Sequence, residues 1–182
     1  MGYSFPTLRT ERFTLRRIGP ADKPRVFEGL SHPEVIRHYG VSYRTLEETQ
    51  QQLDWYDYLL ESRLGIWWGI CYPAQPDRLI GACGFNEWHR AHNRTEVGYW
   101  LLPDHWGQGI MAECLKAIIG FAFSDMHMHR IVAVVESPNR RSALLVQKLG
   151  FRHEGTHREC ERKNGVYIDL DHYALLRGEF GS

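Results

Sequence analysis

Excess charge, paired cysteines and long apolar runs are all scarce in this chain of 182 residues. Lys plus Arg and Asp plus Glu both number 22, so no basic stripe or tail indicates a nucleic-acid partner. Cys71, Cys83, Cys114 and Cys160 form no CxxC pair, which favours reduced thiols over a disulfide framework. We therefore expect a cytoplasmic protein.

Membrane-spanning and exported segments are not indicated either. An uncharged apolar run such as residues 117–124 is far shorter than the roughly 20 residues that cross a bilayer. The first residues also lack the apolar core of a signal peptide. The length suits one hydrophobic core, and no linker or repeat interrupts the chain, so we expect a single domain over residues 1–182.

Hydrophobic periodicity in the first third predicts a strand followed by two helices. Residues 13–18 alternate as a strand does, and a helix is expected from near Asp22. Thr45 and Glu48 have the spacing of a capping box, which predicts a second helix that ends at about Ser62.

The rest of the chain alternates between strands and helices. Two runs rich in β-branched, aromatic and small residues flank a turn and predict an antiparallel hairpin. A third strand precedes a glycine turn and a helix, and a buried strand, a short helix and a hairpin around Asn164-Gly165 follow. This order predicts an α+β layer architecture. The expected elements are the strands 64–73, 79–88, 95–103 and 130–136, the helices 111–123 and 139–148, and the terminal hairpin strands 151–162 and 166–176.

The glycine turn has a geometry that suits a phosphate group. Gly107 and Gly109 have no Cβ, so the chain can curl and direct consecutive N–H groups to one point. The N-terminus of the following helix adds about half a positive charge there. The alternative is structural, because glycine near a helix start is common and a short motif alone is weak.

Two segments in this order resemble the signatures of the GNAT superfamily of acetyltransferases. EVGYWLLPDHWGQGIMAECLKAIIGFAF resembles its coenzyme A-binding strand, turn and helix, and VVESPNRRSALLVQKLGF resembles its second signature. With LRTERFTLRRIGPAD and YIDLDHYALL, the likeness covers nearly the whole chain and points to the branch of ribosomal-protein N-terminal acetyltransferases. It implies the GNAT acyl-CoA N-acyltransferase fold, in which helices flank a central mixed, mostly antiparallel sheet.

The resemblance also implies acetyl-coenzyme A as co-substrate. The pantetheine arm is expected to pair with the 95–103 strand, and the strand of residues 79–88 is expected to splay from that of residues 130–136. Met111 stands where the superfamily has Gly or Ala, and because Met is flexible we expect a local shift in cofactor fit. The implied cofactor contacts are Leu101, Leu102, Trp106, Gly107, Gln108, Gly109, Ile110, Met111, Asn139 and Ser142.

Acetyl transfer needs a stabilised oxyanion and a proton for the departing thiolate. Gly81 and Gly84 indicate a strand bulge, which makes the backbone amide at Cys83 the candidate oxyanion contact. Many GNAT relatives protonate the thiolate with a tyrosine, but the matching position here is Val146. Ser142 lies three residues after Asn139 on the same helix face, and the resemblance implies that it is the catalytic hydroxyl; the alternative is a serine that satisfies the helix backbone.

The general base is less well defined by the sequence. Glu96 is the best-placed carboxylate by resemblance and Glu87 is second, although an exposed strand-end Glu is often only a solvated charge. A covalent intermediate on Cys83 is disfavoured, because nothing nearby in sequence lowers the pKa of that thiol.

Histidine spacing does not indicate a metal site. His153, His157 and Cys160 lie four and three residues apart in an expected strand. Such intervals place side chains on alternating faces, so convergent ligands are not expected.

An amine acceptor follows from the resemblance. A free α-amine is about a tenth neutral at pH 7 and a lysine about one part in 2,500, so a protein N-terminus makes the lighter demand on a base. We expect direct attack in a ternary complex. The alternatives are a small amine, such as a polyamine, amino sugar or amino-acid derivative, and a non-catalytic acyl-CoA-binding module.

Two surface features concern partners. Tyr39, Trp55, Tyr56 and Tyr58 either border the acceptor opening or, as aromatics at helical spacing usually do, belong to the core. An exposed edge strand in the C-terminal hairpin would allow a homodimer.

Overall fold

The computed structural model describes residues 5–181, and its chain divides into two compact units. The first comprises Met1–Asn86 and Gly98–Ile118, and the second comprises Glu87–Val97 and Ile119–Ser182. That residues 1–182 behave as a single domain stays a prediction, and we expect one cooperative unfolding transition.

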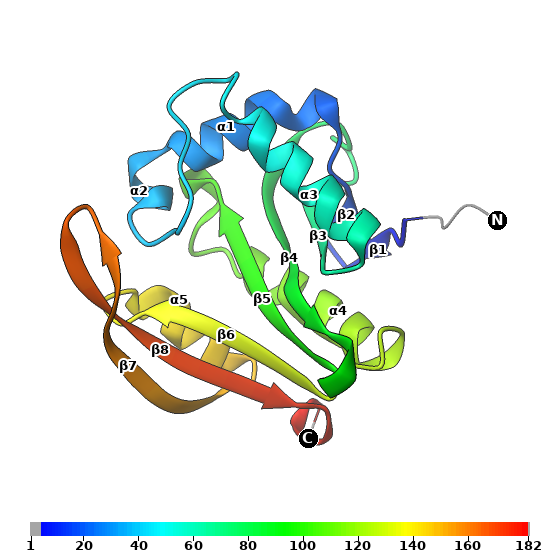
Figure 1. The fold of residues 1–182 in the computed structure, drawn as a ribbon. Coiled ribbons are helices and arrows are strands. Elements are labelled where there is room, and N and C mark those ends of the chain that lie inside the picture. Colours follow the sequence, from blue (N-terminus) through cyan, green and yellow to red (C-terminus); the bar gives the residue numbers. More distant parts are fainter. Residues whose placement is uncertain (1–4, 182) are drawn as a thin grey trace. The chain divides into compact units, whose positions relative to one another are not determined.

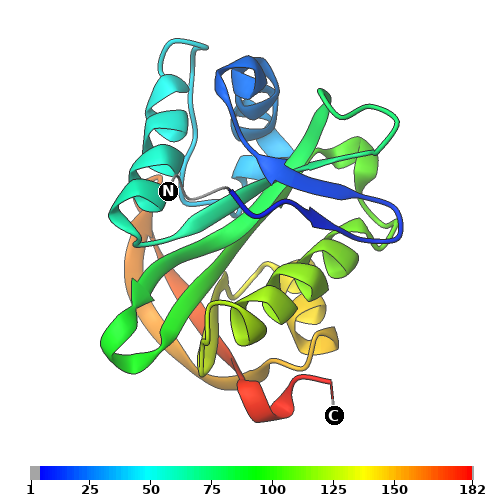
Figure 2. The ribbon, with the colours of Figure 1, turned by 90° about the vertical axis from the view of Figure 1, so that its right-hand side faces the viewer.

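The first unit contains an antiparallel sheet with helices on both faces. Figure 2 shows α1 and α3 on one face of β2, β3 and β4, and the start of α4 on the other. Antiparallel pairing joins β1 to β2, β2 to β3, and β3 to β4. The elements that begin in this unit are β1 (Leu8–Arg9), β2 (Thr14–Arg17), η1 (Pro20–Asp22), α1 (Lys23–Ser31), α2 (Pro33–Ile36), α3 (Gln50–Ser62), β3 (Ile66–Cys71), β4 (Leu79–His89), η3 (Pro103–His105) and α4 (Ile110–Ser124).

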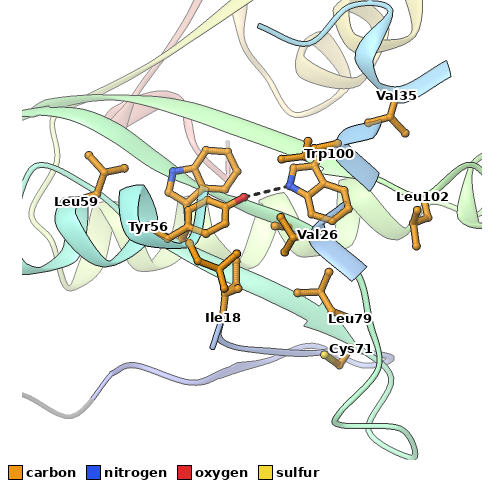
Figure 3. Packing of buried hydrophobic residues seen from close by; sticks show 13 residues of the cluster. Ile18, Val26, Val35, Tyr56, Leu59, Cys71, Leu79, Trp100 and Leu102 are labelled. Carbon is orange, nitrogen blue, oxygen red and sulfur yellow. Dashed lines mark hydrogen bonds between the residues drawn. The ribbon is translucent and has the colours of Figure 1, made fainter. Parts of the chain in front are cut away.

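Aromatic side chains form much of the core in the first unit. Trp100 is buried, and its indole Nε1 donates a hydrogen bond to the hydroxyl of Tyr56 at 3.2 Å (Figure 3). The ring of Trp67 lies 5.3 Å from that of Tyr56, centroid to centroid. A Cβ on Gly29 would lie 2.2 Å from the ring of Trp100, so a glycine is required where α1 meets this indole. Tyr56 therefore belongs to the core.

The helix expected from Thr45 begins later than the capping-box pattern predicts. Thr45 Oγ1 accepts a hydrogen bond from the Glu48 N–H at 3.1 Å, and the Glu48 carboxylate accepts one from the Arg44 N–H at 2.8 Å. The carboxylate thus bonds to Arg44 and not to Thr45, the two contacts stabilise a turn, and α3 begins only at Gln50. Its end at Ser62 agrees with the prediction.

The second unit is built on a long C-terminal hairpin. β6 pairs antiparallel with β8, and β8 with β7. Figure 1 shows α5 lying along β6, with which it is in contact. The remaining elements are η2 (Arg90–His92), β5 (Arg94–Leu101), β6 (Arg130–Glu136), α5 (Arg140–Lys148), β7 (Arg152–Lys163), β8 (Val166–Leu176) and η4 (Arg177–Glu179).

The strands are hydrogen-bonded in the order β1-β2-β3-β4-β5-β6-β8-β7, as one eight-stranded sheet. The pairing of β5 with β6 is parallel, which makes the sheet mixed and confirms the α+β prediction. β7 lies at one end of this order and is exposed along nearly its whole length, as expected of an edge strand. A homodimer through it stays a prediction. No helix within residues 5–181 is long and apolar enough to cross a membrane.

Candidate functional site

The predicted phosphate-binding turn connects η3 to α4, within the first unit. Gly107 has a φ of 74° and Gly109 a φ of 73°, a left-handed conformation that glycine adopts without the strain of a Cβ. The space beside both residues is open. A Cβ on Gly107 would meet no atom within 4 Å, and one on Gly109 would meet only Arg12 Nη2, at 3.8 Å. The turn therefore fits the expected pyrophosphate, at the N-terminus of a 15-residue helix.

Hydrogen bonds hold the two polar side chains of this turn against the backbone before it. Trp106 Nε1 donates to the Leu101 carbonyl at 2.8 Å, and Gln108 Nε2 donates to the Asp104 carbonyl at 3.1 Å. Leu102 is also engaged, because its N–H donates to Ile80 and its carbonyl accepts from His105, both at 3.0 Å. The roles of Leu101 and Leu102 as cofactor contacts stay predictions.

The residues that follow the turn belong to the buried side of α4. Ile110 is 1 % exposed and Met111 is 8 % exposed. Cys114 and Leu115 continue this buried side. The side chain of Met111 is thus part of the core, while any contact of Ile110 or Met111 with the cofactor would use their backbone amides. The effect of Met111 on cofactor fit stays a prediction.

Arg12, in the segment between β1 and β2, forms an ion pair with Glu113 and contacts the glycine turn. The sequence did not indicate this ion pair. The backbone N–H of Arg12 donates to Glu113 Oε1 at 2.9 Å, and Arg12 Nε donates to Glu113 Oε2 at 2.7 Å. Arg12 Nη1 also donates to the Gln108 carbonyl at 3.2 Å. Arg12 lies in the segment LRTERF, which carried the family resemblance but gave this residue no role, because its partners are remote in sequence.

The second signature forms the start of α5, within the second unit. Asn139 is the N-cap residue, and its Oδ1 accepts a hydrogen bond from the Ser142 N–H at 3.2 Å. Ser142 is half-buried, and Val146, at the position of the relatives' tyrosine, is fully buried. Asn139 therefore caps α5, a role beyond the cofactor contact expected of it.

Glu96 belongs to the last residue pair of the parallel β5–β6 ladder. This register runs from Arg94 opposite Arg130 to Glu96 opposite Val132. β5 stands between the 79–88 strand and the 130–136 strand in the sheet order, and the expected splay of these two strands stays a prediction. Glu96 is half-buried. Its role as a base stays a prediction.

The bulge expected at Cys83 is absent from the β3 side of β4. The pairs on that side are regular through Cys83 opposite Trp68, and the register shifts instead at Ile80. Gly81 and Gly84 are needed for another reason. A Cβ on Gly81 would lie 2.6 Å from the Trp100 carbonyl oxygen, and one on Gly84 would lie 2.4 Å from the Ile66 carbonyl oxygen. These glycines allow close approach of neighbouring strands.

The Cys83 side chain is unsuited to nucleophilic chemistry. It is 0 % exposed, and burial raises the pKa of its thiol well above the ordinary value, with a further contribution from Cys114. The raised pKa keeps this cysteine in its thiol form at neutral pH. Because the thiolate is the reactive form, Cys83 is not expected to act as a nucleophile. The Cys83 amide as an oxyanion contact stays a prediction.

Within residues 5–181, no group of three or more His, Cys, Asp or Glu side chains is arranged to hold a metal ion. Trp55 and Tyr58 on α3 are exposed, with Tyr58 at 58 %, whereas Tyr39 and Tyr43 pack against the core around Tyr56.

Comparison with known proteins agrees with this geometry. The sequence matches the profile of the acetyltransferase (GNAT) domain over residues 12–152. It is 33% identical over 174 residues to the uncharacterized N-acetyltransferase YoaA of Bacillus subtilis, covering 95% of this chain and 98% of the relative. It is also 34% identical over 100 residues to the ribosomal-protein-serine acetyltransferase of Escherichia coli, covering 55% of this chain and 56% of the relative.

The fold resembles that of spermidine N-acetyltransferase from Vibrio cholerae, solved in complex with CoA and spermine. The TM-score is 0.81 at 20% identity, and the match covers 92% of this chain and 96% of the other. At this identity the likeness concerns the fold alone.

Proposed function

We propose that this chain, which belongs to the GNAT family of acetyl-coenzyme A-dependent N-acetyltransferases, acetylates a protein N-terminal α-amine. The family membership makes the protein an enzyme that transfers an acetyl group from acetyl-coenzyme A to an amine. The observation that carries the cofactor assignment is the turn with Gly107 and Gly109 at positive φ before α4. The bound co-substrate supplies the acetyl thioester.

Two arguments support an α-amine as the acceptor. One is the 34% identity to an enzyme that is named for acetylating a ribosomal-protein serine. The other is chemical, because an α-amine with a pKa near 8 is about a tenth neutral at pH 7 and needs little help from a base. A lysine side chain, at about 10.4, would require much stronger base catalysis.

We assign the transfer to direct attack of the amine on the thioester carbonyl. The attack forms the new C–N bond and places negative charge on the carbonyl oxygen, which a backbone amide at Cys83 would stabilise. Collapse breaks the C–S bond, and the amine proton is lost to a base. The buried thiol of Cys83, with its raised pKa, argues against an acetyl-cysteine intermediate.

Two side chains are proposed for proton transfer. Glu96 would accept the amine proton, directly or through water, and Ser142 would donate a proton to the departing thiolate. Exchange of Glu96 for Gln tests the first role by the pH profile of kcat/KM, because loss of a base removes the limb that rises with pH. An unchanged profile in a folded E96Q enzyme would exclude Glu96 as the base.

A thiol-release assay with an amine panel tests the acceptor. The panel contains peptides that begin with Ser or Ala, the same peptides blocked at the N-terminus with an internal Lys, spermidine and glucosamine. We expect acetyl transfer to the free N-termini, with the product confirmed by mass spectrometry. Turnover of spermidine or glucosamine without turnover of the peptides would assign a small-molecule acceptor. Binding of acetyl-coenzyme A without turnover of any amine would indicate a non-catalytic module.

A further inference from the structure

Arg12 contacts the glycine turn from a distant part of the chain. It lies between β1 and β2, and its guanidinium donates through Nη1 to the carbonyl oxygen of Gln108. Its Nη2 lies 3.8 Å from where a Cβ of Gly109 would stand. Arg12 therefore lies beside Gly109, where the turn enters α4.

The hydrogen bond to Gln108 fixes the orientation of the next amide. The carbonyl of Gln108 and the N–H of Gly109 belong to one peptide unit, which is planar and trans, so the two groups point in opposite directions. While Arg12 holds the carbonyl, the N–H of Gly109 must point away from Arg12. Without this contact, the two glycines on either side of Gln108 would leave the peptide unit free to rotate.

Glu113 in turn holds Arg12 in place. Its two carboxylate oxygens accept from the backbone N–H and from Nε of Arg12, while its own N–H donates to the Gly109 carbonyl at 3.1 Å in the first turn of α4. Partial burial would raise the pKa of Glu113, but hydrogen bonds from Thr10 and Arg12 lower it overall. Glu113 therefore remains ionised and keeps the guanidinium in a fixed plane.

We propose that Arg12 is a positioning residue for the cofactor, which holds the Gln108 carbonyl so that the Gly109 N–H is directed at the pyrophosphate. This proposal rests on the assignment of the glycine turn to acetyl-coenzyme A. The rigid contact reduces the entropy that the turn would otherwise lose on binding.

A lysine at position 12 separates positioning from simple charge attraction. Lysine keeps the positive charge, but its single ammonium group cannot reproduce the planar fork that reaches Glu113 and Gln108 together. If Arg12 acts by positioning, Arg12→Lys and Arg12→Met should weaken binding alike. If its charge alone attracts the phosphates, Arg12→Lys should bind as the wild type does.

Calorimetry with coenzyme A is the first measurement. We expect both Arg12 variants to raise Kd by about 10-fold to 100-fold, the range for one charge-assisted hydrogen bond, with kcat at saturating acetyl-coenzyme A changed less than about twofold. Glu113→Gln keeps the Arg12 side chain and should raise Kd by a smaller factor. Arg9→Met removes an exposed arginine from β1 and serves as the matched control, with wild-type affinity expected.

Amide hydrogen exchange without ligand is the second measurement. Loss of the Arg12 contact should accelerate exchange at Glu113, whose N–H donates to the Gly109 carbonyl, while core amides of β3 and β4 stay protected and report an intact fold. Wild-type affinity in Arg12→Met, wild-type affinity in Arg12→Lys, or unchanged exchange at Glu113 would each overturn the proposal.

Failure of the underlying cofactor assignment would look different. In that case the wild type would not bind coenzyme A, or Gly109→Val would bind it as well as the wild type does. Either result would overturn both the assignment of the turn and the role of Arg12. Loss of binding in Gly109→Val with full binding in Arg12→Met would overturn the role of Arg12 alone.

Discussion

Asn139 caps the helix that contains Ser142, because its Oδ1 accepts a hydrogen bond from the Ser142 N–H at 3.2 Å. The Asn139 side chain thus stabilises the position of the proposed catalytic serine. The resemblance implies that Asn139 also contacts the cofactor, and we expect its amide nitrogen to make that contact. One side chain would serve both the helix and the cofactor.

Replacement of Asn139 by Ala should therefore affect both stability and cofactor use. We expect the free energy of unfolding to fall by about 1 kcal/mol, as for loss of an N-cap, and the KM for acetyl-coenzyme A to rise. Asn139→Asp keeps a capping oxygen but has no amide donor, so it should retain stability and still raise KM. Denaturant titration and steady-state kinetics check the two effects. Equal stability of Asn139→Ala and the wild type would contradict the capping role.

Exchange of Ser142 for Ala should slow the chemical step. The helix cap uses the backbone N–H of Ser142, which an alanine retains, so stability should change little. We expect kcat to fall by roughly 10-fold to 1,000-fold, within the range for lost acid catalysis, with the affinity for acetyl-coenzyme A nearly unchanged. Single-turnover kinetics measure this effect. A wild-type rate of the chemical step would mean that water alone protonates the sulfur.

A side chain at Gly109 should prevent cofactor binding. Gly109→Val places a β-branched residue at a φ of 73°, which strains the backbone, and puts its methyl groups in the space beside the turn. We expect Kd for coenzyme A to rise by about tenfold or more. Gly40→Val is the control, because a Cβ there meets no atom within 4 Å and its φ is not left-handed. Unchanged affinity in a folded Gly109→Val protein would exclude the turn as the binding site.

The thiol of Cys83 should be dispensable for turnover. It is buried and its pKa is raised, so Cys83→Ala should keep most of the wild-type kcat. Some loss of stability is expected, because the substitution leaves a small cavity in the core. Intact protein mass spectrometry after incubation with acetyl-coenzyme A should show no acetyl group on the enzyme. Abolished turnover with normal cofactor binding would restore a covalent intermediate.

The hydroxyl of Tyr56 should contribute measurably to stability. Tyr56→Phe leaves the buried Nε1–H of Trp100 without its acceptor, so the free energy of unfolding should fall by about 1–3 kcal/mol. Tyr58→Phe is the control, since the exposed Tyr58 should change stability by less than about 0.5 kcal/mol. Chemical denaturation of the three proteins, followed by tryptophan fluorescence, measures the difference. Equal losses in both variants would contradict a specific role for the Tyr56 bond.

Local sequence patterns predicted the elements whose causes lie close together in the chain. Gly107 and Gly109 indicated a turn at positive φ, and Asn164-Gly165 indicated the hairpin turn between β7 and β8. The end of α3 at Ser62 was also correct, while its start was predicted too early. Of the two capping-box contacts, Thr45 Oγ1 accepts from the Glu48 N–H as expected, but the Glu48 carboxylate accepts from the Arg44 N–H, and both bonds lie in a turn before the helix.

Predictions were incomplete where the cause lies in the packing of distant segments. Gly81 and Gly84 were expected only to mark a bulge. The β3 side of β4 has none at Cys83, and both glycines stand where neighbouring strands approach too closely for a Cβ. Arg12 received no role because its partners, Gln108 and Glu113, are separated from it by most of the chain.

The sequence by itself determined the fold class through its hydrophobic periodicity, and the family and reaction class through its resemblance to the GNAT signatures. It also predicted the glycine turn, because glycine spacing is a property of consecutive residues. Only the tertiary structure decided that Cys83 is too buried to react, that Tyr56 belongs to the core, and that Arg12 and Glu113 brace the turn. Burial, the pKa of a thiol and long-range hydrogen bonds depend on which side chains, distant in sequence, lie together in the fold. A local sequence pattern does not contain this information.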